Sequence, residues 1–305
     1  MTNEPTRDGA AGATPCRLCG GPTAPAFSAR DRNHRISPES FRYVSCAACG
    51  TLTLADVPAD LGRYYPASYY GVPDSADAAV ARDENAAHRL ELLRGLVPQG
   101  RLVEIGPSYG GFLELARRAG YDVSAIELDA GCCRFISEQL RLPVTQSDDP
   151  AAALTGPYDA IVMWHVLEHL ADPAALIASA AAALAPGGML IAIAPNPESL
   201  QLKLLGGRWA HVDAPRHLAL IPLAALAGEG AKHGLEVAWS TTADEDALRS
   251  NNFGWSGSLA ASTQNETVAR GLRLGGELVR IAVAPVERRG QRGASYTIAL
   301  RKPSR

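Results

Sequence analysis

The sequence predicts an α/β protein: a doubly wound parallel sheet preceded by a small cysteine-containing module. Strand-like and helix-like hydrophobic patterns alternate from Arg101 to Ser240, an order that places helices on both faces of a parallel sheet. The first strand-like run ends in a glycine-rich loop at residues 106–111, and two C-x-x-C-G motifs precede that run. The 305 residues are enough for one large α/β domain and one small module.

The first ordered element is a predicted zinc ribbon at residues 14–55, after a tail at residues 1–13 whose composition indicates disorder. Two C-x-x-C-G motifs flank an alternating, strand-like run at residues 41–45. Four thiolates satisfy a structural zinc ion, and the glycine after each pair relieves the turn. The predicted ligands are Cys16, Cys19, Cys46 and Cys49. Two disulfides, or reduced cysteines that only pack, are the alternative interpretation.

A tyrosine-rich connector at residues 56–77 follows the ribbon and leads into the main domain, residues 78–305. Its tyrosines are expected to pack the ribbon against the main domain or to line a pocket. They are Tyr64, Tyr65, Tyr69 and Tyr70. Apolar residues at helical spacing predict one helix over residues 78–97. Residues 241–295 are expected to form a mostly helical insertion that could cover a pocket, before a last strand at residues 296–300.

The glycine loop is predicted to bind a cofactor at the C-terminal end of the first strand, with a mere tight turn as the alternative. Glycines let backbone N–H groups approach a ligand where a Cβ would clash, and the following helix N-terminus adds partial positive charge. A second strand-like run ends in Glu127, about 20 residues later, where a carboxylate can hold a ribose diol. Asp148, after the third such run, can accept a hydrogen bond from an adenine amino group. An acidic residue followed by a G-x-G-x-G-like spacing suits S-adenosylmethionine better than a nicotinamide dinucleotide; the residues are Glu104, Gly106, Ser108 and Gly110.

Two further motifs follow, an apolar run with H-x-L-E-H at residues 158–170 and a Pro-Gly-Gly turn before another apolar run at residues 186–193. With them, the chain resembles the class I S-adenosylmethionine-dependent methyltransferases over roughly residues 80–240 and the last strand. The resemblance implies a Rossmann-like sheet and S-adenosylmethionine as the cofactor. The cofactor contacts it implies are Glu104, Gly106, Ser108, Gly110, Glu127, Asp148 and His165.

The ribbon, the connector, the H-x-L-E-H motif and a later segment at residues 209–218 together look like the zinc-ribbon methyltransferases of natural-product and glycan pathways. This resemblance implies methyl transfer to a small-molecule acceptor, first of all a hydroxyl of a metabolite or sugar. Sugar C-methyltransferases share the ribbon but normally carry a larger C-terminal domain, so sugar C-methylation is the alternative. A catalytically inactive homologue that binds the cofactor or a partner protein is a further alternative.

Histidines at the predicted strand-end loops are the candidates for removing the acceptor's proton, because an unperturbed imidazole has a pKa of about 6.5. On a helix, His165, Glu168 and His169 would share one face. Their spacing resembles the E-x-x-E-H motif of small-RNA and ubiquinone-pathway O-methyltransferases, which forms a metal site with a later histidine. That resemblance implies a second divalent ion at Glu168 and His169. The catalytic candidates, as base, metal ligand or structural residue, are His165, His169 and His217.

Asp213 and Arg216 are expected to form an ion pair that orders their loop; the alternative is that Arg216 binds a carboxylate or phosphate of the acceptor. The formal charge of −3 gives no general basic field for nucleic acid. No secretory signal is evident, and the alanine-rich segment at residues 174–185 is too short to span a bilayer. We therefore expect a cytoplasmic enzyme without nucleic-acid or membrane partners, whose oligomeric state stays open.

Overall fold

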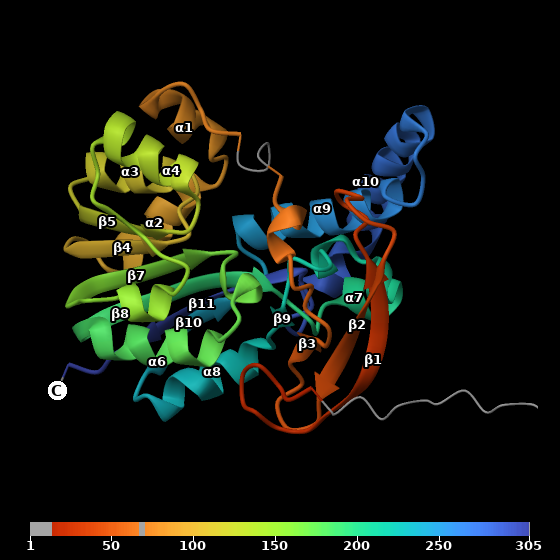
Figure 1. Ribbon diagram of the computed structural model, residues 1–305, viewed down its shortest axis with the longest axis horizontal. Coiled ribbons are helices and arrows are strands. Elements are labelled where there is room, and N and C mark those ends of the chain that lie inside the picture. Colours follow the sequence, from red (N-terminus) through yellow and green to blue (C-terminus); the bar gives the residue numbers. More distant parts are fainter. Residues whose placement is uncertain (1–13, 67–70, 305) are drawn as a thin grey trace, which may run out of the picture.

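The computed structural model describes residues 14–66 and 71–304, which form two sheets with helices packed around the larger one (Figure 1). The predicted tail at residues 1–13, and Tyr69 and Tyr70 of the connector, lie outside the described residues. In the described part of the chain, the larger sheet has seven strands in the order β10-β11-β8-β7-β4-β5-β6. They are β4 (Arg101–Ile105), β5 (Asp122–Glu127), β6 (Val144–Gln146), β7 (Tyr158–Trp164), β8 (Leu184–Pro195), β10 (Glu236–Thr241) and β11 (Ser295–Arg301).

The strand directions confirm the predicted doubly wound sheet. Strands β4 to β8 pair in parallel, and β11 is inserted antiparallel between β8 and β10. Because the carboxyl ends of parallel strands meet at one edge, the segments that follow β4, β5, β6 and β7 all lie at that edge. This edge carries every residue that the sequence predicts to contact a cofactor.

Helices cover both faces of the large sheet, and the alternation of side chains along each strand supplies an apolar surface to each layer. Leu102 and Val162 pack on one face, and their neighbours Val103 and Ile161 pack on the other. The first face is covered by α1 (Ala76–Arg82), α2 (Ala86–Leu96), α3 (Gly111–Arg118), α4 (Ala130–Phe135) and the turn η2 (Ile136–Leu140). The second is covered by α5 (Pro150–Ala153), α6 (Pro173–Ala183) and α8 (Leu223–Lys232).

The prediction of one helix over residues 78–97 is wrong, because α1 and α2 are separated at residues 83–85. The carboxylate of Asp83 accepts a hydrogen bond from the backbone N–H of Asn85 at 3.3 Å. Aspartate and asparagine side chains offer the backbone such local partners, which compete with helical hydrogen bonds. The apolar spacing continues across the break, so periodicity alone does not reveal it.

The smaller sheet joins the N-terminal module to the main domain. Its order is β1-β2-β3-β9, with β1 (Thr23–Arg30), β2 (Ser40–Cys46), β3 (Leu52–Leu54) and β9 (Ala219–Leu220), all antiparallel. The last strand comes from far along the chain. The backbone of Leu218 continues the connection, because its carbonyl accepts from Leu54 at 2.9 Å and its N–H donates to Glu168 at 2.7 Å. The ribbon is therefore hydrogen-bonded, through one residue, to the turn after β7.

An apolar cluster fills the space between the ribbon and the main domain. Tyr43, Tyr64 and Trp209 are fully buried in it, and the rings of Phe41 and Tyr64 meet edge to face at 5.8 Å. The hydroxyl of Tyr43 donates to the carbonyl of His217 at 2.7 Å. The connector turn η1 (Leu61–Tyr64) thus contributes to the packing between the two parts.

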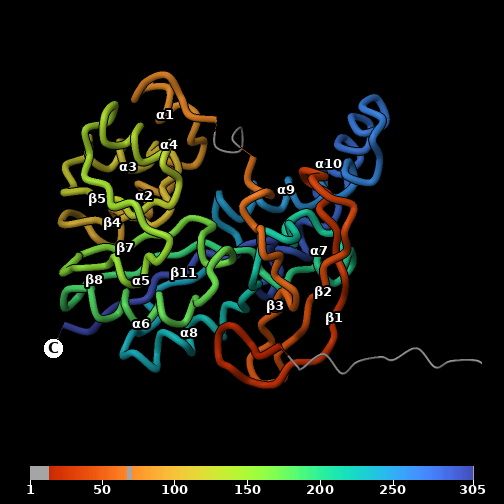
Figure 2. The backbone as a smooth tube through the Cα atoms, in the orientation of Figure 1, coloured from red at the N-terminus to blue at the C-terminus, as the bar shows by residue number. Residues whose placement is uncertain are grey.

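The remaining helices lie beside the ribbon and above the sheet edge. They are α7 (Leu200–Leu205), α9 (Glu245–Ala260) and α10 (Glu266–Glu287), with the short turns η4 (Gly206–Arg208) and η5 (Ala210–Val212). The chain passes through α9 and α10 between β10 and β11, and α10 extends outward on the ribbon side of the molecule (Figure 2). Among the described residues, no helix combines the length and apolarity that crossing a bilayer requires.

A buried ion-pair network crosses the boundary between the ribbon and the main domain. The guanidinium of Arg216 is fully buried; it donates to both carboxylate oxygens of Asp213 at 2.7 Å and to Asp31 at 2.8 Å. The second oxygen of Asp31 accepts from the backbone of Ile36 at 2.8 Å, which orders the loop after β1. Burial alone would raise the pKa of Asp213, but hydrogen bonds and charge from Arg216 lower it to about 2.

We expect Arg216→Met to lower the free energy of unfolding by about 3–5 kcal/mol, because it leaves two carboxylates without their cation. Urea denaturation followed by circular dichroism measures this. Arg42→Met is the matched control, since its ion pair with Asp56 joins side chains that are 58% and 61% exposed and should contribute little.

The same network predicts a pH dependence. The pKa of Asp213 is about 2 in the folded protein, below the value of about 3.9 for an unfolded chain. Its contribution to stability is therefore complete above the unfolded pKa and is lost as the pH falls through about 2.

Equal loss of stability in Arg216→Met and Arg42→Met would show that the network does not hold the two parts together.

Candidate functional site

The loop after β4 is held against the end of β5 by a carboxylate. Glu127 accepts the backbone N–H of Ser108 at 2.9 Å with one oxygen and those of Leu128 and Asp129 at 2.8 Å with the other. The loop has left-handed backbone at Gly106 (φ 67°), Ser108 (φ 54°) and Gly110 (φ 76°). A Cβ at Gly106 would lie 2.8 Å from Val166 Cγ2, so this glycine is required by both conformation and space.

Glu104, the last acidic residue of β4, lies buried behind this loop. One of its carboxylate oxygens has no hydrogen-bond donor among the described residues. Burial, with the nearby charges of Asp83 and Glu127, raises its pKa well above the ordinary value, although Arg89 opposes the shift. A buried acid without a donor is unfavourable unless a ligand supplies one.

The structure thus brings most of the predicted cofactor residues to adjacent strand ends. Glu104, Gly106, Ser108 and Gly110 follow or end β4, Glu127 ends β5, and His165 follows β7. Asp148 lies exposed after β6, and the structure records no contact between it and the other residues of this group. Their roles toward a cofactor stay predictions.

The expectation that His165, Glu168 and His169 share one face of a helix is wrong. His165 has left-handed backbone (φ 58°) immediately after β7, and only the short turn η3 (Leu167–His169) follows. The N–H of His165 donates to Ile193 of β8 at 2.9 Å, which keeps this residue attached to the sheet. As a result the two imidazoles have different partners. His165 Nδ1 lies 3.3 Å from Glu168 Oε1, whereas His169 Nδ1 lies 3.1 Å from the carbonyl of Arg216.

Two side chains of this turn and one from the segment before β9 lie close together. Glu168, His169 and His217 each offer one ligand atom, and these atoms lie within 4.8 Å of one another. His217 Nδ1 lies 2.8 Å from the carbonyl of His211, as His169 Nδ1 lies near that of Arg216. A carbonyl only accepts, so each neutral ring carries its proton on Nδ1 and keeps the Nε2 lone pair. Metal-binding histidines are commonly held in this way.

The electrostatics of the cluster keep Glu168 ionised and His169 neutral at neutral pH. Burial would raise the pKa of Glu168, but the nearby charges of His165, His217 and His169 lower it to about 2. Burial and the neighbouring His217 lower the pKa of His169 to about 4. Neither oxygen of Glu168 has a well-aligned hydrogen-bond donor in the described part of the chain, although His165 Nδ1 lies 3.3 Å from one of them.

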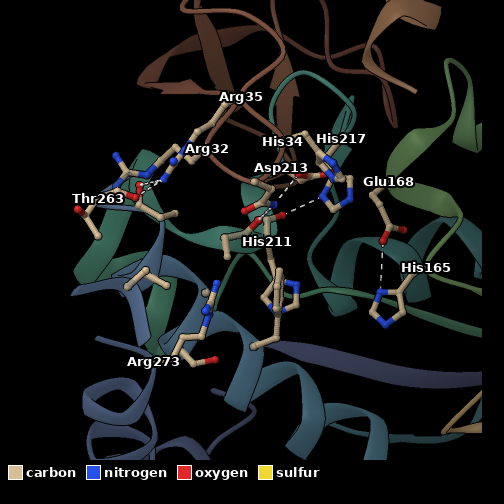
Figure 3. Close-up of a pocket in the computed structure, with 18 of the residues that line it drawn as sticks. Arg32, His34, Arg35, His165, Glu168, His211, Asp213, His217, Thr263 and Arg273 are labelled. Carbon is tan, nitrogen blue, oxygen red and sulfur yellow. Dashed lines mark hydrogen bonds and ion pairs between the residues drawn. The ribbon is translucent and has the colours of Figure 1, made fainter. Parts of the chain in front are cut away.

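This cluster opens into a cavity of about 750 Å³. Three segments remote in sequence form its walls, namely residues 32–35 of the ribbon, residues 210–217 of the main domain, and residues 253–273 of α9, α10 and their connection. Figure 3 shows His165 and Glu168 at one end of the cavity and Arg32, Arg35 and Arg273 at the other. The residues predicted from the sequence therefore occupy one end only.

Several residues of this site were not predicted from the sequence. The cationic end depends on the loop after β1, where Arg32, His34 and Arg35 lie close together in the sequence, and on Arg273 of α10. The clustering in residues 32–35 is a signal that the sequence does offer. The hypothesis that Arg216 binds an acceptor anion is wrong, because its side chain is fully buried and bound to Asp31 and Asp213.

The four predicted zinc ligands also converge. Cys16 Sγ lies 3.6 Å from Cys49 Sγ, and Cys19 Sγ lies 3.5 Å from the sulfurs of Cys46 and Cys49. A disulfide would require about 2.05 Å, and none of the six cysteines is paired. Thiolates around one zinc ion, each about 2.3 Å from it, lie at about the observed separations. The remaining pair, Cys132 and Cys133, is buried in the helix after β5.

Comparison with known proteins places these features in context. Residues 79–238, just over half of the chain, match the family model described as methyltransferase domain. The ubiquinone biosynthesis O-methyltransferase of Xanthomonas campestris pv. campestris is 30% identical over 125 residues, which cover 38% of this chain and 52% of that protein. The protein of the same name from Cereibacter sphaeroides is 31% identical over 118 residues, covering 36% and 47%. The chain thus spans about half the length of the curated relatives it matches.

Solved structures share the fold at low identity. Phosphoethanolamine N-methyltransferase 2 of Haemonchus contortus, in complex with S-adenosyl-L-methionine, gives a TM-score of 0.52 at 15% identity, covering 83% of this chain and 62% of that one. A Galdieria sulphuraria protein, provisionally described as a sarcosine dimethylglycine methyltransferase, gives 0.53 at 14% identity, covering 80% and 99%.

Proposed function

The chain belongs to the methyltransferase-domain family, and on that premise we propose that it transfers a methyl group from S-adenosylmethionine to a hydroxyl of a small-molecule acceptor. One observation carries the proposal. The histidine–glutamate cluster lies between the strand ends predicted to bind the cofactor and a cavity of about 750 Å³, a volume typical of small-ligand sites. The curated relatives, named as O-methyltransferases, support oxygen as the attacked atom.

The residues at the strand ends fit S-adenosylmethionine. Glu127 already accepts three backbone N–H groups, and a carboxylate has about four acceptor positions, so one remains for a ribose hydroxyl. The unpaired oxygen of Glu104 is suited to receive the ammonium group of the methionine moiety. When bound, the cofactor supplies a methyl group that its sulfonium already activates. The protein must then position the acceptor oxygen and remove its proton.

We infer that His165 takes that proton. It lies at the end of β7, at the boundary between the cofactor loop and the cavity, and its Nδ1 faces Glu168 at 3.3 Å. The other ring nitrogen, Nε2, is then the one available to an acceptor hydroxyl. As the proton moves from the hydroxyl to Nε2, the buried carboxylate of Glu168 stabilises the imidazolium. The left-handed backbone of His165 fixes this placement without a helix.

A divalent ion is a second means of activating the hydroxyl, and a specific observation favours it. His169 and His217 each bring one ring nitrogen within 4.8 Å of a Glu168 oxygen, and the carboxylate of Glu168 lacks a well-aligned donor among the described residues. Two imidazoles and one carboxylate suit zinc or a transition metal better than magnesium. When bound there, such an ion would lower the pKa of a hydroxyl next to it. His165 remains the base in either case.

The ribbon is proposed to hold a structural zinc ion at Cys16, Cys19, Cys46 and Cys49. The donor set and the sulfur separations support zinc rather than a redox pair. Such an ion would fix β2 and β3, and through β3 the backbone of Leu218 and the turn that carries Glu168. A cytoplasmic location, predicted from the sequence, would keep these thiols reduced.

We expect the purified protein to contain one zinc ion per chain at the four-cysteine cluster, and Cys49→Ser to lower both the zinc content and the melting temperature. Mass-spectrometric metal analysis after gel filtration measures the content. Cys133→Ala is the control, because Cys133 lies outside the cluster. Zinc-free wild-type protein that remains folded would overturn the zinc assignment.

Glu127→Ala should weaken S-adenosylmethionine binding by about 10- to 100-fold, since a hydrogen bond to a charged group contributes about 1.5–3 kcal/mol. Isothermal titration calorimetry measures the affinity. Asp122→Ala is the matched control, because Asp122 begins the strand that Glu127 ends and is exposed. Glu127→Gln tests whether the loss of affinity comes from the missing contact with the ligand or from disorder of the loop. Its amide keeps one acceptor oxygen for the backbone N–H groups of the loop. Unchanged affinity in both variants would remove Glu127 from the cofactor site.

His165→Ala should slow methyl transfer by about 10²- to 10⁴-fold while leaving S-adenosylmethionine affinity within about twofold. Transfer of labelled methyl to a panel of hydroxylated aromatic and sugar compounds, with the product identified by mass spectrometry, measures the rate. His233→Ala on α8 is the control. A wild-type rate in His165→Ala would exclude His165 as the base.

Cobalt titration tests the metal hypothesis directly, because it detects ion binding without requiring methyl transfer. Zinc-loaded wild-type protein should bind one further Co²⁺ ion, with weak visible bands typical of nitrogen and oxygen ligands. His217→Ala should not bind it, whereas His165→Ala should. If no further ion binds to the wild type, the cluster acts without a metal.

A further inference from the structure

We propose that the acceptor carries a carboxylate or phosphate group, bound by Arg32 and Arg273 at the end of the cavity remote from His165. This inference rests on the proposed function, because it names the chemical class of the acceptor. The two arginines belong to opposite walls, one in the loop after β1 and the other on α10 (Figure 3).

Arg32 is a partly buried cation without an anionic partner. Its Nε is shielded from solvent and has no hydrogen-bond partner among residues 14–66 and 71–304. The neighbouring charges that affect it, Arg208 and Arg35, are both positive, and together with burial they lower its pKa. Asp31, next to it in the chain, is already bound to Arg216 and to two backbone N–H groups. A ligand with negative charge would offset the repulsion among these three cations.

Arg273 reaches the cavity from the opposite wall and forms no ion pair with any residue that the structure describes. In Figure 3 its guanidinium extends from α10 toward the space between the walls. Arg35 instead donates to the carbonyls of Ala261 and Thr263, so it ties the ribbon loop to the connection between α9 and α10 while keeping its charge beside the cavity.

The acidic residues of the cavity do not neutralise this end. Asp213 is bound to Arg216 and Asn33, and Glu168 lies in the histidine cluster. Glu266 remains, exposed in the first turn of α10. Three arginines against one exposed glutamate leave an excess of positive charge, and a guanidinium fork matches the geometry of carboxylate and phosphate.

The cavity is therefore bipolar, with a proton acceptor at one end and an anion site at the other. An acceptor bound at both ends would present its hydroxyl at His165, because the charged group fixes its orientation. Binding energy from a group remote from the reacting atoms is a common means of positioning a substrate.

Anion binding to the S-adenosylmethionine-loaded protein tests the proposal. Inorganic phosphate and benzoate are the probes for the two sources of negative charge, and benzyl alcohol is the neutral counterpart, all followed by ligand-observed NMR. We expect one anion to bind and benzyl alcohol not to bind at equal concentration. Arg32→Gln and Arg273→Gln should each weaken the anion by about 10-fold or more. Preference for phosphate indicates a phosphorylated acceptor, and preference for benzoate a carboxylic acid.

Arg270→Gln is the matched control, since Arg270 lies on the same helix but does not line the cavity. Absence of anion binding, or binding unchanged in both variants, would overturn the proposal. So would an effect of Arg208→Gln without one of Arg273→Gln, which would locate the anion in a neighbouring hollow of about 410 Å³ beside Arg208. The affinity for S-adenosylmethionine is measured on the same samples. If the wild-type protein does not bind S-adenosylmethionine, the proposed function is wrong. If it binds S-adenosylmethionine but no anion, only this inference is wrong.

Discussion

The buried guanidinium of Arg216 is the interaction on which the rest of the site depends. Its side chain binds Asp31 of the ribbon and Asp213 of the main domain, and its own carbonyl accepts from His169. One residue therefore joins the two sheets and sets the tautomer of a site histidine. Because this ion pair is largely buried and fully hydrogen-bonded, it favours one arrangement of the loops around it.

The two loops that this ion pair joins set the two ends of the cavity. Asp31 orders the backbone up to Ile36, which places Arg32 at the cationic end, while the carbonyl of His211 directs the ring of His217 toward Glu168 at the other. The turn after β7 is fixed in turn by the N–H of Leu218. The ribbon thus forms one wall of the cavity that we propose binds the acceptor.

Much of the sheet could be predicted because its central strands β4, β5 and β7 are short apolar runs, and a local signal such as Glu127 marks the end of a strand. The four-cysteine cluster could also be predicted, because the C-x-x-C-G spacing within each pair is visible in the sequence. The turn at His165 was not, because its left-handed backbone depends on a hydrogen bond to Ile193 of another strand. Nor could the two-residue strand β9 be predicted, as it exists only by pairing with β3. The cationic end of the cavity could not be predicted for the same reason, because only folding brings Arg32 and Arg273 to one cavity.

The division of the walls bears on how such a protein can change during evolution. The residues predicted to hold the cofactor and the proposed base, His165, lie within one stretch, 104–165, whereas most of the wall of the cavity is contributed by three separate segments. Substitutions in the ribbon loop or in α10 could therefore alter acceptor preference while the chemistry is inherited unchanged.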